Sequence, residues 1–250
     1  MPSTPSHLPP AILGVVIPAY KEANNIGTLL RAIRDVIPAS IIVVVDDSPD
    51  QETKIAFEIL SLPNATFVHR ETKGGRGSAV LAGIKILLDQ NCERIIEMDA
   101  DMSHPPSQLP QLVAEAENRQ LDLLVASRYL PQSKIANWPV ARRVFSIASN
   151  RLARLLLQVP ISDYTNGYRV YSRSAAEKIT ETCGQLGSGF IALSEILVNL
   201  FYRGFRVGET PTVFTNRLRG ESSITSVEVR NALIGLGRIY LLKRKLIAGR

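Results

Sequence analysis

Two carboxylates separated by one residue are the clearest chemical feature of this chain. Asp99 and Asp101 follow a short apolar run that ends at Met98. At the end of a buried strand, two carboxylates with this spacing can converge on one hard cation, and oxygen ligands suit Mg²⁺ or Mn²⁺. Such an ion bridges a diphosphate and neutralises the charge that grows on a departing nucleotide. The alternative for this motif alone is an acidic turn before a helix that opens at His104.

Polar side chains also follow three other apolar runs. Asp46 and Asp47 end the second run, where adjacent carboxylates repel unless something binds there. Asp46 is expected to accept hydrogen bonds from a base or a ribose. Asp47 either binds a ligand or caps the helix that follows. Residues 18–22 follow the first run, and residues 127–129 follow the fifth. The glycine-rich segment 73–77 precedes a helix and fits a phosphate-binding loop or a plain turn equally well.

These clusters are positioned by an alternation of strands and helices in the first half of the chain. Because ligands of open parallel sheets bind beyond the carboxyl ends of the strands, four polar clusters at four such ends predict one shared crevice. The alternation itself predicts an α/β fold, with a mostly parallel central sheet and helices on both faces. Strands are predicted at 13–17, 41–45, 66–69, 94–98 and 123–126, and helices at 25–37, 51–60, 78–88 and 107–118.

The second half is less regular. A basic amphipathic segment at 140–159 precedes a polar stretch at 163–169. The remaining pattern predicts a helix at 190–202, a strand at 206–214, a loop at 216–223 and a last helix at about 226–247.

Composition limits the classes of partner and compartment. The formal net charge is +6, which favours nucleotides, lipid phosphates, anionic lipids or nucleic acid, with a generic basic surface as the alternative. The basic residues are not interleaved with stacking aromatics along strands, so we expect no nucleic-acid partner. Cys92 and Cys183 are far apart and predict neither a disulfide framework nor a zinc site. No run approaches the roughly 18 apolar residues of a membrane span or the apolar region of a signal peptide, so a cytoplasmic location is expected.

The motifs, taken in order, are similar to those of the family 2 glycosyltransferases. Within that family they most resemble the dolichyl- or polyprenyl-phosphate mannosyltransferases, the dolichol-phosphate mannose synthase group. The resemblance covers about residues 12 to 240. It departs from the family pattern at Lys21, where the usual residue is Asn. The segments that carry it are 15–26, 43–50, 98–106, 126–129, 163–169 and 217–223.

The resemblance implies a GT-A fold and an inverting transfer of a hexose to dolichyl or polyprenyl phosphate. The implied donor is GDP-mannose, with UDP-glucose or another nucleotide sugar as the alternative. The implied metal ligands for Mg²⁺ or Mn²⁺ are Asp99 and Asp101. The implied nucleotide-sugar site consists of Pro18, Tyr20, Glu22, Asp46, Asp99, Ala100 and Asp101. The implied donor- and acceptor-phosphate site consists of Arg128, Arg142, Arg143 and Arg219.

The expected catalytic residues are Asp101, Asp163, Arg128 and Arg219. A sugar hydroxyl needs a general base, whereas a phosphomonoester with a second pKa of about 6 is already a nucleophilic anion at neutral pH. Asp163 is the candidate for a base or a positioning carboxylate, or else caps a turn before Thr165. The alternatives are a family 2 enzyme with a hydroxyl or polysaccharide acceptor, and a non-catalytic nucleotide-binding subunit of a membrane complex.

The predicted organisation has three parts. Residues 1–10 contain four prolines and are expected to be a flexible tail, and 11–225 to be the GT-A catalytic domain. Residues 226–250 are expected to form a C-terminal amphipathic basic helix that lies on a membrane or docks a membrane-spanning partner subunit. The segment 140–159 fits a helix lying on an anionic bilayer, or a helix packed on the domain with a solvated basic face. We therefore expect peripheral association with the cytosolic face of a membrane.

Overall fold

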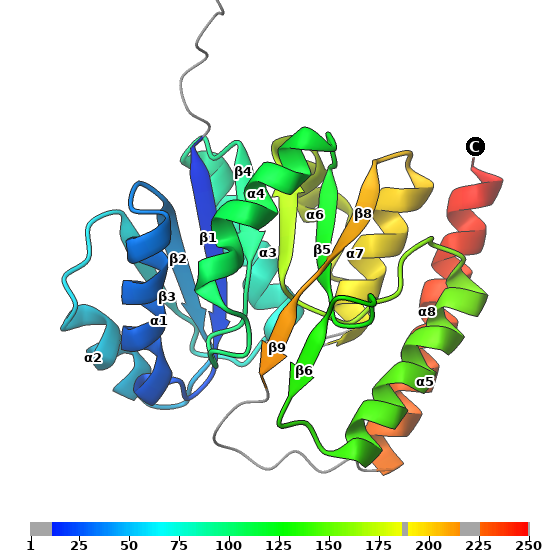
Figure 1. Cartoon of the computed structure of the whole chain (residues 1–250), viewed down its shortest axis with the longest axis horizontal. Helices are drawn as coiled ribbons and strands as arrows, with labels where there is room; N and C mark the ends of the chain where they lie inside the picture. Colours follow the sequence, from blue (N-terminus) through cyan, green and yellow to red (C-terminus); the bar gives the residue numbers. More distant parts are fainter. Residues whose placement is uncertain (1–11, 187–189, 216–225, 250) are drawn as a thin grey trace, which may run out of the picture.

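The structure is a computed structural model that describes residues 12–186, 190–215 and 226–249. The predicted tail at 1–10 and the predicted loop at 216–223, which contains Arg219, lie outside these residues. Figure 1 shows the described elements, which in chain order are β1 (Leu13–Ala19), α1 (Ala23–Val36), β2 (Ile41–Asp46), α2 (Glu52–Glu58), β3 (Ala65–His69), α3 (Arg76–Asp89), β4 (Arg94–Glu97), the 3₁₀ turn η1 (Pro106–Gln108), α4 (Leu109–Asn118), β5 (Leu123–Ser127), β6 (Lys134–Ala136), α5 (Val140–Leu157), β7 (Arg169–Ser172), α6 (Arg173–Thr182), α7 (Phe190–Tyr202), β8 (Val207–Pro211), β9 (Val213–Thr215) and α8 (Ser226–Ala248).

A seven-stranded sheet forms the centre of the molecule, in the order β3-β2-β1-β4-β7-β5-β8. Strand β7 runs antiparallel to β4 and to β5, and the other neighbouring strands of this sheet are parallel. The five strands predicted in the first half are all present. Their β-branched and aliphatic residues favour extended backbone. They are mostly buried on both faces in β1, β2, β4 and β5, as parallel sheets require, whereas the edge strand β3 is half-buried throughout. The prediction of a mostly parallel α/β sheet is therefore confirmed.

Helices cover both faces of this sheet because alternate strand residues point to opposite sides. On β1, Val15 and Ile17 belong to one core cluster, together with residues of α1 and α4. Val16 belongs to the other cluster, together with residues of α3, α6 and α7. Figure 1 shows α1 and α4 in front of the sheet and α3, α6 and α7 behind it.

Two elements next to each other were missed in the polar stretch that follows α5. Arg169–Ser172 forms β7, which inserts between β4 and β5. Helix α6 begins directly after it, and the Ser172 hydroxyl caps this helix by accepting a hydrogen bond from the Ala175 N–H at 3.2 Å. Four residues are too few for a periodic pattern, and their partner strands lie far away in the sequence. Strand β7 is therefore decided by long-range pairing.

The strand predicted at 206–214 is wrong as a single strand. Its first part, β8, pairs with β5 in the central sheet, and its second part, β9, pairs with β6 in a separate two-stranded sheet. The break lies at Thr212, whose N–H donates to the Ser127 carbonyl at 3.2 Å while its carbonyl accepts from the Lys134 N–H at 3.0 Å. Both bonds join residues distant in sequence, which is why the local pattern did not reveal the break.

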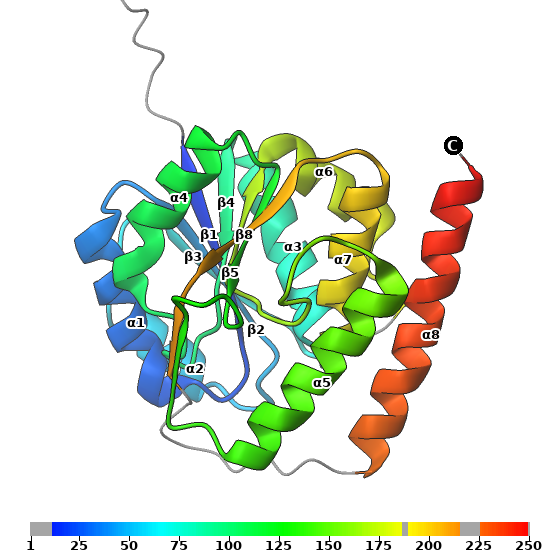
Figure 2. The same ribbon diagram turned by 45° about the vertical axis from the view of Figure 1, so that its right-hand side comes forward.

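Helices α5 and α8 lie side by side at one flank of the molecule, as Figures 1 and 2 both show. Helix α8 packs mainly against α7 and also contacts α5. The buried ammonium group of Lys243 on α8 donates to the Leu156 carbonyl at 2.9 Å and to the Gln158 side chain at 2.5 Å, so it caps the end of α5. No helix in the described ranges is both long and apolar enough to cross a bilayer.

Candidate active site

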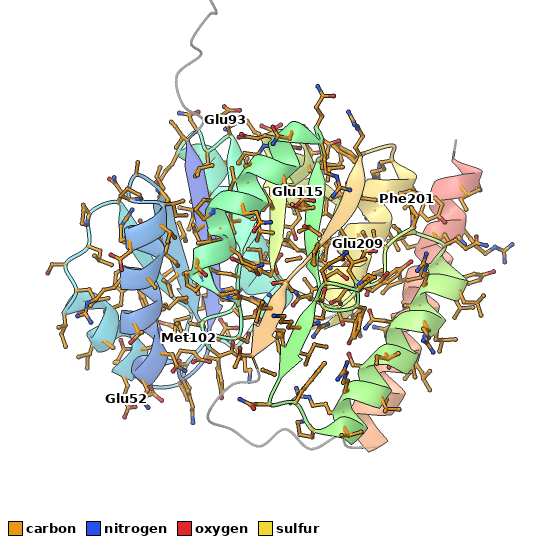
Figure 3. The ribbon with its side chains drawn as sticks, in the orientation of Figure 1. Glu52, Glu93, Met102, Glu115, Phe201 and Glu209 are labelled. Atoms are coloured by element: carbon orange, nitrogen blue, oxygen red, sulfur yellow. The ribbon has the colours of Figure 1, made fainter. Side chains whose placement is uncertain are left out.

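The polar clusters meet at one edge of the central sheet. In the register of the parallel strands, Ala19 at the end of β1 lies opposite Asp46 at the end of β2, and Val16 lies opposite Glu97 at the end of β4. Figure 3 shows the direction of β4, because Glu93 just before it is labelled at the top of the molecule and Met102 beyond it in the lower half. The carboxyl ends of β1, β2 and β4 are thus adjacent, as the predicted shared crevice requires.

The adjacent acids after β2 are each held by an internal partner. Asp46 is fully buried and accepts a hydrogen bond from the Ser48 hydroxyl at 2.6 Å, with His69 Nδ1 at 3.2 Å from its other oxygen. Asp47 forms a bidentate pair with Arg70, at 2.6 and 2.7 Å. The structure therefore does not support the alternative that Asp47 caps α2, because its carboxylate binds a guanidinium instead.

The loop after β1 is tied to the loop after β2. The N–H of Lys21 donates to the Ser48 hydroxyl at 2.7 Å, and the N–H of Glu22 donates to the Thr53 hydroxyl at 3.1 Å. Lys21 has a φ of 59°, in the left-handed region where Asn is better tolerated than Lys. This conformation explains why Asn is the usual residue at this position in the resembled family.

Two further residues predicted to contact the nucleotide lie beside these loops. Tyr20 is exposed, and the Lys73 ammonium lies 3.7 Å from the centre of its ring. Pro18 is half-buried within β1 and lies opposite Val45. The ring of Tyr20 is thus oriented by a cation–π contact at the edge of the sheet, and it offers a flat surface to a ligand.

Asp99 and Asp101 follow β4, as predicted, and have different partners. Asp99 Oδ1 accepts hydrogen bonds from Arg76 Nε at 2.8 Å and Nη2 at 2.6 Å. Asp101 Oδ1 accepts from the Ser103 N–H at 3.1 Å, which closes a tight turn. Ala100 between them is buried. The two carboxylates are therefore held on a rigid turn by named contacts.

His104 is a site residue that sequence reasoning missed, because it was interpreted only as a helix opener. Its ring is fully buried and stacks on Tyr168, with 4.8 Å between the ring centres. The Asp99 N–H donates to Nδ1 at 3.1 Å, so Nε2 carries the ring proton and donates to the Asn166 amide oxygen at 3.0 Å. Burial lowers the pKa of His104, against the opposing effect of Asp99 and Asp101. A neutral imidazole thus positions the backbone of Asp99.

Arg128 and Asp163 form a buried pair. Arg128 Nε and Nη2 each bind one carboxylate oxygen at 2.8 Å, and the Arg128 N–H also donates to Oδ2 at 3.0 Å. Oδ1 of Asp163 further accepts from the N–H groups of Thr165 at 3.2 Å and Asn166 at 3.0 Å. Burial alone would raise the pKa of Asp163, but the guanidinium and the backbone N–H groups hold it below its usual value. This carboxylate has the geometry of a positioning group that also caps a turn.

Aromatic rings surround the Arg128 guanidinium. Its central carbon lies 5.3 Å from the centre of the Phe214 ring, 5.4 Å from that of Trp138 and 5.5 Å from that of Tyr129. Rings at this distance are attracted to a cation and keep water away from it. A charge in such surroundings interacts with a ligand more strongly than it would in water.

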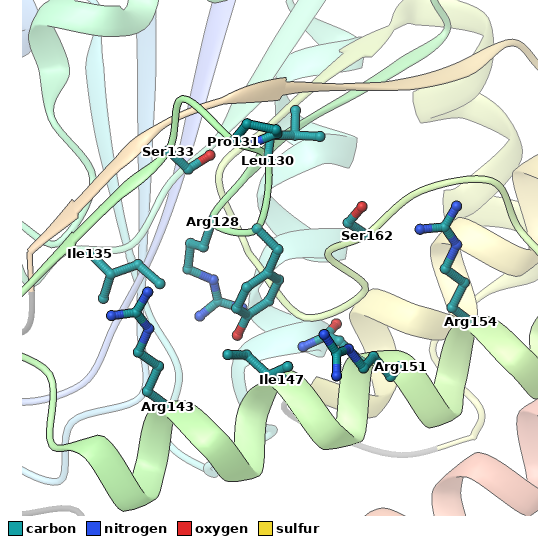
Figure 4. Close-up of a pocket in the computed structure, with 12 residues that line it drawn as sticks. Arg128, Leu130, Pro131, Ser133, Ile135, Arg143, Ile147, Arg151, Arg154 and Ser162 are labelled. Carbon is teal, nitrogen blue, oxygen red and sulfur yellow. The ribbon is translucent and has the colours of Figure 1, made fainter.

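A pocket of about 430 Å³ lies between helix α5 and the segment that follows β5. Figure 4 shows Arg143, Arg151 and Arg154 rising from α5 toward this segment, with Arg128 facing them. Two arginines predicted to bind phosphate, Arg128 and Arg143, are thus brought together. Sequence reasoning saw Arg151 and Arg154 only as part of a basic cluster. The lining is made of Arg128, Tyr129, Leu130, Pro131, Ser133, Ile135, Arg143, Ile147, Asn150, Arg151, Arg154 and Ser162.

Arg142 lies apart from this lining. Its guanidinium carbon is 5.7 Å from the centre of the Trp138 ring, next to the start of α5. Of the arginines predicted to bind phosphate, Arg128 and Arg143 line the pocket, and Arg142 shares the Trp138 ring with Arg128. Arg219 falls outside the described residues.

The donor set at Asp99 and Asp101 fits a hard divalent cation that is shared with a ligand. Within the described ranges, no group of three or more His, Cys, Asp and Glu side chains forms a complete metal site. Mg²⁺ characteristically takes one or two carboxylates from the protein and its other oxygens from water and substrate phosphates. Two carboxylates on one turn meet this requirement once a diphosphate supplies oxygens.

Comparisons with known proteins agree with this geometry. The sequence model of glycosyl transferase family 2 matches residues 14–180. A polyprenol monophosphomannose synthase of Mycolicibacterium smegmatis is 37% identical over 222 residues, which is 88% of this chain and 83% of the relative. An undecaprenyl-phosphate mannosyltransferase of Micrococcus luteus is 34% identical over 240 residues, 92% of this chain and 94% of the relative.

Solved structures share the fold. Glucosyl-3-phosphoglycerate synthase of Mycobacterium tuberculosis in complex with UDP superposes with a TM-score of 0.66 over 92% of this chain and 80% of that chain, at 18% identity. The same enzyme with Mn²⁺, UDP-glucose and phosphoglyceric acid gives a TM-score of 0.64 over 91% of this chain and 80% of that one, at 18% identity. The GT-A fold implied by the motifs is thereby confirmed. With the family match over most of its length, the chain belongs to the family 2 glycosyltransferases.

Proposed function

We propose that this protein transfers mannose from GDP-mannose to the phosphate of a polyprenyl or dolichyl lipid. The two relatives named above are polyprenyl-phosphate mannosyltransferases by name, and each aligns with most of this chain. The observation that carries the acceptor assignment is the pocket beside Arg128, which is lined by four arginines. An anionic acceptor fits this lining better than a neutral sugar hydroxyl does.

The state of Asp163 also supports a phosphate acceptor. Its carboxylate is fully buried and bound by Arg128 and the turn N–H groups, and its pKa is lowered. A group in this condition is poorly placed to take a proton from a hydroxyl. A phosphomonoester, with a second pKa of about 6, needs no such base at neutral pH. The acceptor itself therefore supplies the nucleophile.

The proposed step is a single displacement. An oxygen of the lipid phosphate attacks C1 of the sugar, the bond from C1 to the diphosphate oxygen breaks, and the nucleoside diphosphate leaves with the electron pair. Arg128, held by Asp163, orients the acceptor phosphate, and Tyr20 and Glu22 orient the nucleotide. The buried Asp46 supports their loop through Ser48, which binds the Lys21 N–H. The rate comes mainly from this positioning and from fixed charge at the site.

Asp99 and Asp101 are the residues that would hold Mg²⁺ or Mn²⁺. When bound, the metal neutralises charge on the diphosphate leaving group. Complexes of the M. tuberculosis enzyme with Mn²⁺ and a uridine nucleotide support a metal of this class in the shared fold. The transfer assay described next compares Mg²⁺ with Mn²⁺.

The test is transfer of radiolabelled mannose from GDP-mannose to a short polyprenyl phosphate with Mg²⁺ or Mn²⁺. UDP-glucose runs in parallel, and unphosphorylated polyprenol serves as the acceptor control. We expect label in the lipid phosphate only with GDP-mannose, abolished by EDTA and by Asp101→Asn. Asp89→Asn, which changes an exposed carboxylate at the end of α3, should leave transfer unchanged.

Each other outcome contradicts a named part of the proposal. Labelling from UDP-glucose would change the donor, and labelling of polyprenol would overturn the phosphate acceptor. Binding of nucleotide without transfer to any acceptor would favour the non-catalytic subunit. Transfer that persists in EDTA would overturn the proposal that the reaction requires a divalent metal.

We also propose that the protein works at the cytosolic face of a membrane, where a polyprenyl acceptor resides. The flank formed by α5 and α8 supports this. Val140 and Leu155 on α5 are 77% and 73% exposed, and Leu241 on α8 is 58% exposed, on two helices that also carry exposed arginines. Exposed apolar side chains interleaved with basic ones suit an anionic bilayer surface.

Sedimentation with vesicles tests this surface. We expect binding to vesicles that contain phosphatidylglycerol, weakened by salt and by Leu155→Asp. Ile59→Asp is the matched control, because Ile59 is 74% exposed at the end of α2, at the opposite flank (Figure 1). Equal loss in both variants, or no binding by the wild type, would contradict the proposal and favour docking through a partner subunit.

A further inference from the structure

Arg76 lies inside a group of carboxylates at the end of β4. It is the first residue of α3, and its guanidinium binds two acids at once. Nε and Nη2 donate to Asp99 Oδ1, and Nη1 donates to Glu97 Oε1 at 2.5 Å. Its side chain is only 20% exposed. The carboxylate assigned above to a divalent cation therefore already has a cation of the protein's own.

Glu97 links this guanidinium to the core. It is fully buried, and a buried carboxylate is costly unless it is paired and hydrogen-bonded. Arg76 binds one of its oxygens, and the Tyr171 hydroxyl donates to the other at 2.6 Å. Tyr171 on β7 is itself fully buried. The series Tyr171, Glu97, Arg76 and Asp99 is thus a continuous set of hydrogen bonds from the core to the edge of the sheet.

The backbone around Arg76 is shaped to receive the guanidinium. Gly75, just before it, has a φ of 81°, a conformation that side chains rarely tolerate. Gly167 lies against the guanidinium, and a Cβ at this position would be 1.8 Å from Nη2. Only a residue without a side chain admits Arg76 here. Gly167 therefore leaves room for the guanidinium, and Gly75 sets the backbone at the start of α3.

Arg76 stays charged at any working pH. A guanidinium is far too basic to lose its proton near neutrality, and this one lies between the carboxylates of Asp99 and Glu97. A divalent cation on Asp99 would be repelled by this guanidinium and would compete with it for Oδ1, the oxygen that Arg76 binds twice. A nucleoside diphosphate brings negative charge that offsets this repulsion.

We propose that Arg76 is the internal counter-cation of Asp99, which makes metal binding weak in the free protein and couples it to the nucleoside diphosphate. Arg76 acts here as a positioning residue, because it holds the carboxylate in place before the donor arrives. The proposal rests on the metal site proposed above. It predicts that the metal and the nucleotide bind together, each much more tightly in the presence of the other.

Titration of Mn²⁺, followed by the electron paramagnetic resonance signal of the free ion, tests the proposal without any turnover. Wild type and Arg76→Gln are compared with and without GDP, and with UDP in parallel. We expect Arg76→Gln to bind Mn²⁺ at least tenfold more tightly without nucleotide, which is about 1.4 kcal/mol. The factor by which the nucleotide tightens Mn²⁺ binding should fall correspondingly.

Two matched variants separate position from charge. Gly167→Ala keeps every charge but forces the guanidinium away from its place, so it should tighten Mn²⁺ binding in the same direction by a smaller factor. Lys178→Gln removes one exposed positive charge on α6, where Lys178 pairs only with Glu181 among the described contacts, and should change nothing. A thermal melt establishes that each variant is folded. If Arg76→Gln does not fold, Mn²⁺ binding by Gly167→Ala tests the role of Arg76 instead.

The failures of the two proposals can be told apart. The role of Arg76 is overturned if both site variants bind Mn²⁺ without nucleotide within twofold of the wild type. If instead the wild type binds no Mn²⁺ even with nucleotide, or Asp101→Asn binds it equally well, the metal site itself is wrong. Mn²⁺ binding by the wild type that is equally tight with and without nucleotide would also overturn the coupling.

Discussion

The donor side and the acceptor side of the site differ in whether their charged side chains are paired within the protein. On the donor side, at the ends of β2 and β4, acidic groups already have partners from the protein, as in the pairs Asp47–Arg70 and Asp99–Arg76. On the acceptor side, α5 carries Arg143, which is exposed and faces a pocket. The first region is a network of internally paired charges, and the second is an open basic surface.

This difference indicates two kinds of recognition. A network of paired charges is preorganised and responds strongly when one member is removed, because its partner is left unpaired. Exposed arginines attract an anion over a distance and each contributes modestly, with an effect that salt weakens. Arg128 lies between the two regimes, since it lines the pocket but is buried and anchored by Asp163. The following predictions are ordered from the largest expected effect to the smallest.

The largest effect is expected from Asp163→Asn. The change leaves the Arg128 guanidinium buried without its carboxylate, which should lower the free energy of unfolding by about 3–5 kcal/mol. Urea denaturation followed by circular dichroism measures it. Because the pKa of Asp163 is lowered in the fold, its stabilisation is present above the unfolded value and is lost as the pH falls through the native one. The gap between wild type and variant should therefore shrink in acid.

Asp89→Asn is the control for this prediction. Its carboxylate is exposed, so we expect a change below about 0.5 kcal/mol. A loss of stability in Asp163→Asn no larger than in Asp89→Asn would show that the Arg128–Asp163 pair is not the anchor described here.

Arg128→Lys tests whether the fork of the guanidinium matters beyond its charge. Lysine cannot bind both oxygens of Asp163 in the plane that Arg128 uses, so the acceptor phosphate should be misplaced. We expect kcat/KM for polyprenyl phosphate to fall about 10²–10³-fold, as for loss of one preorganised charge contact. Arg31→Lys on the exposed surface of α1 is the control. Activity within threefold of wild type would show that Arg128 contributes only its charge, like the exposed arginines of α5.

The arginines of α5 should each contribute less. Replacing Arg143, Arg151 or Arg154 singly by Gln removes one exposed charge from the pocket lining. We expect KM for polyprenyl phosphate to rise about three- to tenfold, with kcat unchanged and a larger effect at low salt. Steady-state kinetics at two ionic strengths measure this. Lys85→Gln on α3 is the charge control, and a fall in kcat with constant KM would contradict an acceptor-binding role.

The smallest effect is expected on the donor side, at its exposed cation. Lys73→Gln removes the ammonium over the Tyr20 ring, a contact that in exposed positions contributes about 0.5–1 kcal/mol. The dissociation constant of GDP should rise about two- to fivefold in calorimetric titration. Lys54→Gln on α2 is the control, because Lys54 forms an exposed ion pair with Glu58 at 3.9 Å, its one ion pair within the described part of the chain. Tighter GDP binding in Lys73→Gln would show that the ammonium hinders the nucleotide.

Part of the site was predictable from local sequence. Asp99 and Asp101 follow an apolar run, and Asp46 and Asp47 follow another, so the sheet had to bring these carboxylates to one edge. Their partners were not predictable. Arg70 was not singled out and Arg76 was seen only as part of a glycine-rich segment, because the ion pairs join them to residues more than twenty positions away.

The amino-acid sequence by itself determined the strands and helices of the first half and the acids at the strand ends, because hydrophobic periodicity and strand polarity are local properties. Only the tertiary structure decided that β7 inserts between β4 and β5, that Asp163 anchors Arg128 and that His104 supports Asp99. The strand insertion and both contacts depend on which distant segments of the chain become neighbours when the sheet and its covering helices pack together. A local pattern carries no information on such pairing, whereas a buried charge is stable only where the fold supplies its partner.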